Sequence, residues 1–249
     1  MGLKESGLRG SLRNVSVGID AIPDSGGTHQ WNKDEGDGSE VADGIGSLDG
    51  TINGASWASD AGAGGFYLDY DSTDDYVEIL TGTYSDFNHF TESGEGTFAI
   101  WLRPDTIGRY DLIGGGRSSD LVNAGMRIND DGSWQFWAFD GSGNSIWDIA
   151  GSSATSDEWQ FVAGTADGST ARIYEAKAGD NYDVSEVASA SIDSGNFTTN
   201  DWDIDFDLGR DGRDLHYFDG GLDMPWTDDS VASESRLQEW VDDTKEFYE

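Results

Sequence analysis

The sequence predicts an all-β fold in which two antiparallel sheets pack as a sandwich, with an N-terminal arm and a C-terminal amphipathic helix. Three observations predict it: eight short segments alternate or run apolar, Gly- and Asp-rich turns separate them, and strands do not alternate with helices. Such a pattern is typical of sandwiches. The 249 residues are enough for one such domain. We expect it at residues 28–232, after an arm at 1–27 and before a helix at 233–249.

The first nineteen residues form a basic segment ahead of the expected domain. Its cations are Lys4, Arg9 and Arg13. One acid, Glu5, opposes them, so the segment carries +2 and the rest of the chain −37. A short cationic arm on an acidic body predicts an anchor that orders against an acidic neighbour, either another copy or a partner. A frayed terminus without a role is the alternative.

The expected strands follow between residues 66 and 208. They are Phe66–Tyr70, Asp75–Ile79, Thr97–Arg103, Met126–Ile128, Ser133–Phe139, Gln160–Ala166, Ala171–Glu175 and Asp203–Leu208. Asp-Gly pairs at 131–132 and 167–168 join consecutive strands, because Asp-Gly supplies the positive φ that a short hairpin turn requires. The chain is therefore expected to form hairpins here.

The segment at 133–139 is aromatic on both of its faces. Trp134 and Phe136 share one face, and Trp137 and Phe139 share the other. A sandwich strand buries one face in the core, so the second pair needs another cover. That cover is a subunit contact, packing beneath loops, or a sugar that stacks on the rings. We take Trp137, Phe139 and the nearby Trp147 as candidate glycan-binding residues.

Residues 233–249 are predicted to form one helix. Ser233 is a suitable N-cap, and Glu234 in the first turn faces the positive end of the helix dipole. Apolar side chains then recur at intervals of three or four: Leu237, Trp240, Val241, Thr244, Phe247 and Tyr248. This stripe must be buried on the sandwich or on a partner.

The composition excludes several partners. Against 49 Asp and Glu the chain has only 14 Lys and Arg, a net charge of −35. Nucleic-acid binding needs cationic side chains that replace counterions, so we expect no nucleic-acid partner. Anionic membranes repel acidic proteins. No apolar run is long enough for membrane insertion. Cysteine is absent. A net charge of this size makes the folded chain repel itself, and molar salt would screen that repulsion. The charge therefore favours a salt-loving source.

Several segments occur in a fixed order along most of the chain. They are Trp31–Asp43, Gly44–Thr51, Leu68–Val77, Thr97–Pro104, Glu158–Thr165 followed by Asp167-Gly168, and Phe218–Asp223 followed by Ala232–Leu237. Together they resemble the laminin-G-like, concanavalin A-like jelly-roll domains. The resemblance implies the antiparallel jelly-roll sandwich predicted above. Ser72, where the pattern has Gly, and Trp226, in place of an apolar-basic strand, depart from it.

The opening residues carry a second resemblance. Gly2–Ser16 and the following Ile22–Ser25 are similar to the starts of laminin-G-like proteins of haloarchaeal viruses. This implies a structural virion surface protein, such as a capsid turret, spike or tail fibre, assembled in the host cytoplasm. Its start also lacks the apolar core of a signal peptide. We expect a homo-oligomer that holds other virion proteins through its arm and binds host cell-surface glycans or S-layer glycoprotein.

Calcium is the cofactor that the sequence suggests. Asp43 and Asp49 flank a Gly-rich loop whose carbonyls can turn inward, and calcium prefers carboxylate and carbonyl oxygens. The resemblance implies that Asp223, on the closing strand, approaches this loop. With 49 acids in the chain, however, any loop contains an Asp pair. Asp43, Asp49 and Asp223 are therefore the candidate Ca²⁺ ligands.

An enzyme is the less favoured interpretation. Asp203, Asp205 and Asp207 would share one face of a strand, at about 7 Å spacing, within the range of the carboxyl pairs of inverting glycosidases. A solvated acidic strand would look the same. The histidines show no metal-ligand spacing. We expect no catalysis; the alternatives are a haloarchaeal cell-surface carbohydrate-binding or adhesion module and, less favoured, a glycoside hydrolase.

Overall fold

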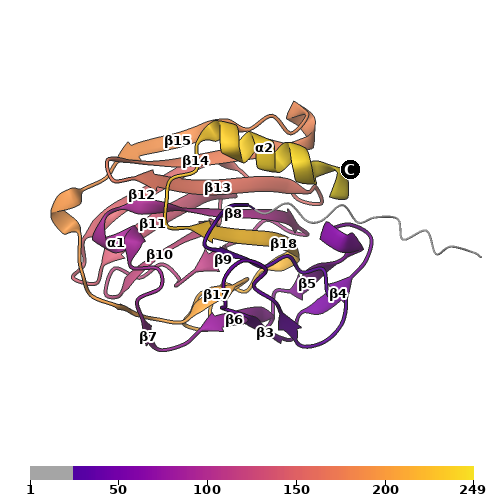
Figure 1. Ribbon diagram of the computed structural model, residues 1–249, viewed down its shortest axis with the longest axis horizontal. Coiled ribbons are helices and arrows are strands. Elements are labelled where there is room, and N and C mark those ends of the chain that lie inside the picture. Colours follow the sequence, from indigo (N-terminus) through magenta and orange to yellow (C-terminus); the bar gives the residue numbers. More distant parts are fainter. Residues whose placement is uncertain (1–24) are drawn as a thin grey trace, which may run out of the picture.

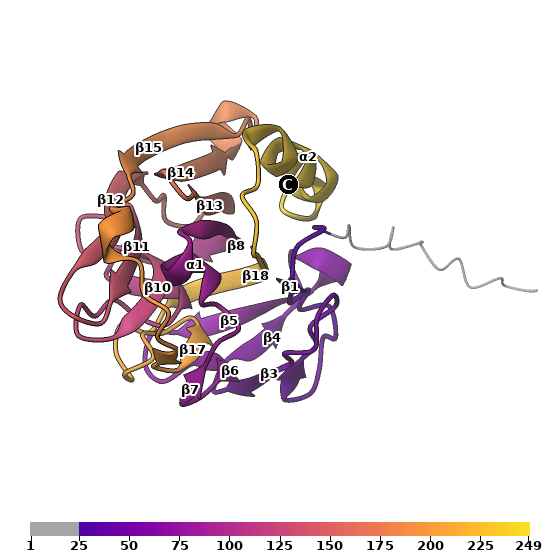
Figure 2. The ribbon, with the colours of Figure 1, turned by 60° about the vertical axis from the view of Figure 1, so that its left-hand side comes forward.

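Two antiparallel sheets packed face to face form a jelly-roll sandwich in the computed structural model, which describes residues 25–249 (Figures 1 and 2). The first, which we call the helix-side sheet, runs in the order β15 (Ser185–Ser191), β14 (Thr170–Lys177), β13 (Gln160–Asp167), β8 (Glu95–Pro104), β18 (Asp219–Asp228), β5 (Tyr67–Asp71) and β4 (Ser56–Ala58), with β1 (His29–Gln30) paired to β18. The predicted fold class is confirmed.

The second sheet, which we call the front sheet, has eight strands. Their order is β12 (Ser145–Ser153), β11 (Ser133–Asp140), β10 (Val122–Ile128), β9 (Tyr110–Gly114), β17 (Phe206–Leu208), β6 (Tyr76–Leu80), β3 (Gly50–Asn53) and β2 (Glu40–Val41). A two-stranded sheet joins β16 (Trp202–Asp203) to β7 (Thr83–Tyr84). Short helical segments are α1 (His89–Glu92), η1 (Ala63–Gly65), η2 (Ala178–Asp180), η3 (Ser194–Asn196) and η4 (Lys245–Phe247).

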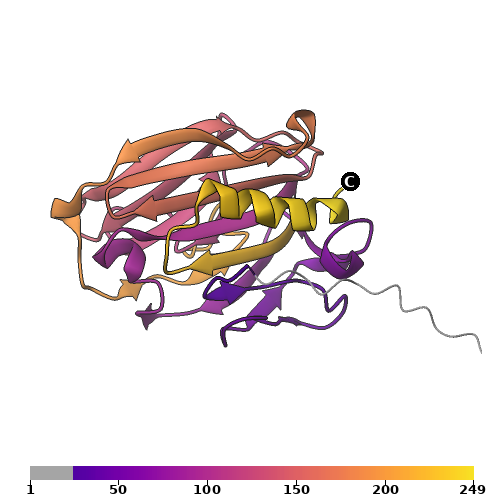
Figure 3. The ribbon, with the colours of Figure 1, turned by 45° about the horizontal axis from the view of Figure 1, so that its top comes forward.

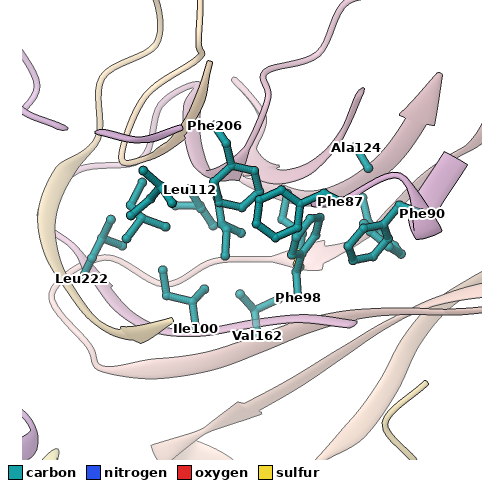
Figure 4. Close-up of a cluster of buried hydrophobic side chains, with 14 of the residues drawn as sticks. Phe87, Phe90, Phe98, Ile100, Leu112, Ala124, Val162, Phe206 and Leu222 are labelled. Atoms are coloured by element: carbon teal, nitrogen blue, oxygen red, sulfur yellow. The ribbon is translucent and has the colours of Figure 1, made fainter. Parts of the chain in front are cut away.

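The core lies between the two sheets (Figure 4). Phe87 and Phe206 stack with ring centroids 4.1 Å apart, and Phe90 and Phe98 stack at the same distance. Both pairs are buried. Aromatic side chains bury the largest apolar areas, so this aromatic row holds the sheets together.

Helix α2 (Glu234–Thr244) covers the outer surface of the helix-side sheet (Figure 3). Ser233 caps it by accepting the N–H of Arg236 at 3.3 Å. Its buried stripe packs on Trp101, Phe161 and Trp226. The predicted helix is present, and the sheet of its own chain takes up the apolar stripe.

The structure corrects one predicted strand. Asp203–Leu208 is two strands, because β16 pairs with β7 whereas β17 pairs with β6 and β9. The chain changes sheets at Ile204, whose carbonyl oxygen accepts the hydroxyl of Tyr84 at 2.7 Å. The pattern also missed several strands, among them β9 and the edge strands β12 and β15, in which small polar residues weaken the apolar alternation.

No helix among the residues described is long and apolar enough to cross a membrane. The predicted anchoring cations Lys4, Arg9 and Arg13 lie outside the described residues.

Candidate functional site

Asp43 anchors the loop that follows it. Its Oδ1 accepts the backbone N–H groups of Gln30 and Gly46 at 3.1 and 2.8 Å, and its Oδ2 accepts that of Leu48 at 3.0 Å. His29 Nδ1 lies 2.6 Å from Oδ2. Burial raises the pKa of Asp43, but these hydrogen bonds outweigh it and hold the pKa well below its usual range. The carboxylate therefore orders the loop directly.

The other two predicted calcium ligands do not gather with the Asp43 carboxylate into one metal site. Asp49 is exposed and accepts the N–H of Asp43 at 2.9 Å. Asp223 is fully buried on β18, where its Oδ2 accepts the hydroxyl of Tyr248 at 2.8 Å. The donor atoms of the three carboxylates do not gather within 4.8 Å of one another. Calcium here stays a prediction that rests on the resemblance.

The three predicted glycan residues occupy two surfaces of the front sheet. Trp147 is buried in the core, with its ring 5.1 Å from that of Phe136. Trp137 and Phe139 point to the opposite surface, which we call the front face. Their cover is arginine: the guanidinium carbon of Arg127 lies 5.3 Å from the Trp137 ring and that of Arg117 lies 5.1 Å from Phe139. Trp147 therefore does not join the other two.

The three aspartates considered for hydrolysis do not form one row. Asp203 accepts the hydroxyl of Thr83 at 3.1 Å in the small sheet. Asp207 is buried on β17, where Arg210 Nε donates to its Oδ2 at 2.8 Å. Arg210 also contacts Asp205, with Nη2 3.8 Å from its Oδ2, so Asp205 and Asp207 share one arginine while Asp203 stands apart from them.

Sheet pairing builds a polar cluster on the front face. Asp111 on β9 stands beside Arg127 on β10, with Oδ2 and Nη1 4.0 Å apart. The loop between β17 and β18 brings three further residues, Asp211, Arg213 and His216. His216 Nδ1 lies 3.8 Å from Asp111 Oδ2 and 3.9 Å from Asp211 Oδ2. Arg213 binds Asp211 through both Nε and Nη2. We call Arg109, Asp111, Arg127, Asp211, Arg213 and His216 the front-face cluster.

Backbone hydrogen bonds fix this loop over the sheet. The N–H of Gly209 donates to the carbonyl of Leu112 at 3.0 Å, and the N–H of Asp111 donates to the carbonyl of His216 at 3.1 Å. Gly209 has a φ of +86°, which favours glycine. The loop is thereby tied to β9, and its charged side chains are held against those of the strand.

Hydrogen-bonding capacity is left over on this face. Of sixteen buried side-chain atoms that lack a partner in the described chain, seven are here: Arg109 Nε, both carboxylate oxygens of Asp111, Arg117 Nε, Arg127 Nη1, Asp207 Oδ1 and His216 Nδ1. Buried polar groups normally find partners, because leaving one unmet costs about 1–3 kcal/mol. Burial raises the pKa of Asp111 to about 7, although Arg127 opposes the shift. Such a concentration marks a functional site better than a structural one.

Two groups of three potential metal ligands occur among the described residues. One is Asp71, Asp74 and Asp75 in the turn between β5 and β6, where two of the three are exposed. The other is Asp111, Asp211 and His216. In the second group the neighbouring guanidinium groups already supply positive charge, which opposes a cation.

A hollow of about 500 Å³ lies elsewhere, beside η4 and the end of the chain. Trp159 and Tyr248, two of its aromatic residues, already pack together at 4.8 Å. Arg103, also in its lining, donates to the hydroxyl of Tyr67 at 2.8 Å. Since its arginine and rings have partners within the fold, we place the candidate site on the front face instead.

Sequence reasoning missed the front-face cluster. Its members come from two strands and a loop about a hundred residues apart, and only strand register brings them together. One signal was available: Arg127 interrupts the apolar run of β10 between Met126 and Ile128. An arginine at such an outward position is a candidate to cover the second aromatic face, which Trp137 and Phe139 form.

Comparisons with known proteins agree with this architecture. The sequence profile Laminin_G_3, described as the concanavalin A-like lectin/glucanases superfamily, matches residues 71–235. No curated protein matches the sequence.

Among solved structures, the chain is similar to domain 4 of an extracellular arabinanase from Geobacillus stearothermophilus in complex with arabinotriose, with a TM-score of 0.62, 16% identity, and coverage of 86% of this chain and 97% of that one. It is also similar to Trypanosoma rangeli sialidase in complex with sialic acid, with a TM-score of 0.60, 12% identity, and coverage of 91% and 34%. A third similar structure is the binding domain of botulinum neurotoxin serotype D, with a TM-score of 0.59, 10% identity, and coverage of 85% of this chain and 50% of that one.

At these identities the structural likeness concerns the fold alone. The profile, in contrast, spans more than half of the sequence. The chain therefore belongs to the concanavalin A-like lectin/glucanases superfamily.

Proposed function

We propose that this protein is a glycan-binding module whose ligand lies on the front face. The unmet hydrogen-bonding atoms of the front-face cluster carry the proposal. Sugar hydroxyls both donate and accept hydrogen bonds, so they suit a surface on which carboxylates and guanidinium groups stand side by side. The arabinanase domain solved with arabinotriose has the same fold.

Partly exposed aromatic rings border the cluster. Tyr76 on β6 and Tyr217 in the loop lie with their centroids 6.5 Å apart, and the guanidinium of Arg210 covers Tyr76 at 3.4 Å. Aromatic rings present flat apolar surfaces to which the C–H face of a sugar can pack. We propose binding without hydrolysis, since Asp203 lies in a different sheet from Asp207 and the arginine that Asp205 and Asp207 share occupies Asp207 in an ion pair.

A glycan array probed in molar salt tests this function. Gln135 lies at the cluster, where its Oε1 accepts Arg127 Nε at 2.8 Å, so Gln135→Ala should weaken binding about three- to tenfold through lost hydrogen bonds. Asn181→Ala, in the lining of the hollow beside η4, is the matched amide control and should bind like the wild type. The opposite result would place the ligand in that hollow and overturn the front-face site.

We further propose that the module is displayed on a virion and bound to it through residues 1–27. The supports are the resemblance of its opening residues and the +2 charge of residues 1–19 on an otherwise acidic chain. Deleting residues 2–19 should release the protein from particles in molar salt and leave glycan binding unchanged. Incorporation of the truncated protein at the wild-type level would contradict the anchoring role.

A further inference from the structure

Arginine is concentrated on the front face. The described part of the chain contains eight arginines. Five lie on this face or at its border: Arg109, Arg117, Arg127, Arg210 and Arg213. The chain as a whole has a charge of −35, so five arginines on one face indicate that this face has a functional role.

Arg109 stands out among these residues. Within residues 25–249 it has no hydrogen bond and no carboxylate within 4.0 Å, and its Nε is buried without a partner. Arginines of the opposite side behave differently: Arg172 binds Asp167 at 2.7 Å, and Arg236 binds Asp228 at 2.6 Å. Arg109 thus has no carboxylate in direct contact, although its charge acts on Asp111 at longer range.

The guanidinium groups of the front face also crowd one another. Burial lowers the pKa of Arg127 to about 10; Asp111 opposes this shift, and the positive charges of Arg109 and Arg117 add to it. Burial likewise lowers the pKa of His216, and Arg109 is the next cause. Like charges held together are unfavourable unless an anion joins them.

Charge counting separates a cation from an anion as the missing partner. Within the front-face cluster alone, Asp111 and Asp211 contribute −2, and Arg109, Arg127 and Arg213 contribute +3, which leaves +1 with His216 neutral. Arg117 and Arg210 are left out of this count because they pair with Asp148 and Asp207. A divalent metal ion would raise this to +3, whereas one carboxylate or sulfate monoanion would bring it to zero. Electrostatics therefore favours an anion beside Arg109, even though three metal-ligating side chains are present.

We infer that the front face binds an acidic saccharide, one whose carboxylate or sulfate accepts hydrogen bonds from Arg109 with Arg127 and Arg213 alongside. The inference rests on the proposed glycan-binding function and names its ligand class. A guanidinium presents parallel N–H groups that match two oxygens of such an anion. The neighbouring carboxylates of Asp111 and Asp211 then accept hydroxyl groups of the same sugar.

Matched ligands test the charge of the saccharide. Oligosaccharides bearing uronates are compared with their carboxyl-reduced forms, and sulfated ones with their desulfated forms, by titration calorimetry in molar salt. We expect the charged member of at least one pair to bind about tenfold or more tightly, and the pairs separate carboxylate from sulfate. Equal binding of both members, or binding of neutral glycans alone, overturns the inference and leaves glycan binding intact. Binding of no glycan at all overturns the proposed function itself.

A variant pair tests the residue. Arg109→Gln should weaken the charged ligand about tenfold and leave its uncharged counterpart unaffected, while Arg172→Gln, on β14, should change neither. Arg109→Lys keeps the positive charge but loses the two parallel N–H donors of the guanidinium. Its affinity for the charged ligand should lie between those of the wild type and Arg109→Gln. Melting temperatures verify that each variant is folded. Wild-type affinity of Arg109→Gln for the charged ligand would overturn the inference.

Discussion

The stability lost on replacing Lys33 by methionine is expected to grow by about 3 kcal/mol between pH 7 and about pH 9.5, at 1.4 kcal/mol per pKa unit. Lys33 is fully buried, with Nζ 3.2 Å from the Tyr70 hydroxyl and 3.3 Å from the Leu222 carbonyl. Burial lowers its pKa to about 7, although the charges of Asp223 and Glu35 oppose the shift.

The direction of this dependence follows from proton binding. Above pH 7 the folded protein has released the Lys33 proton, whereas the unfolded chain keeps it up to the ordinary pKa of 10.5. The unfolded state therefore binds more protons throughout this interval, and wild-type stability rises with pH. The Lys33→Met variant has no such amine, so its stability lacks this rise and the difference between the two proteins grows with pH.

Urea denaturation of wild type and Lys33→Met at several pH values and constant salt measures the difference. Lys177→Met serves as the control, because Lys177 is partly exposed and pairs with Glu175 rather than being fully buried. A difference for Lys33→Met that stays flat with pH would mean that the buried amine keeps its ordinary pKa.

Asp43→Ala is expected to lower the free energy of unfolding by about 3–5 kcal/mol at neutral pH, since it leaves several buried and part-buried N–H donors without their acceptor. The donors include the backbone of Gly46 and Leu48, which fix the loop, and the ring of His29. The pKa of Asp43 lies below its usual range, so its contribution is present above the ordinary value of 3.8 and is lost as the pH falls below it.

Chemical denaturation at pH 7 tests this, with Asp37→Ala as the control because Asp37 is exposed. A loss as small as that of the control would show that the loop does not depend on Asp43. Repeating the melts with Ca²⁺ and with a chelator tests the predicted calcium site. A Ca²⁺-dependent rise that disappears in Asp43→Ala would place the ion there.

The sequence predicted the sandwich because its strong strands alternate clearly, as Ser133–Phe139 does, and the C-terminal helix because Ser233 and the stripe from Leu237 to Val241 mark its start and its buried face. It was wrong about Asp203–Leu208, where the alternation continues although the chain changes sheets. Alternation reports which side chains are buried, and Ile204 and Leu208 are buried in either arrangement.

The candidate site was less accessible to sequence reasoning. The need for a cover over Trp137 and Phe139 followed from the alternation, but the identity of that cover did not. Arg117 and Arg127 reach the two rings only because β9 to β12 pair in the observed register. Asp43 shows a related limit, since an aspartate before a glycine-rich loop has the same sequence pattern whether it binds a metal ion or the loop itself.

The position of β18 has a consequence for the order of events during synthesis. This strand, Asp219–Asp228, lies between β8 and β5 in the middle of the helix-side sheet. Until residue 228 has left the ribosome, β8 and β5 each present an open edge, and the partner that closes both is still missing. The strands β8 and β5 therefore keep these edges open until β18 has been synthesised, and in that interval they are most exposed to pairing with other nascent copies.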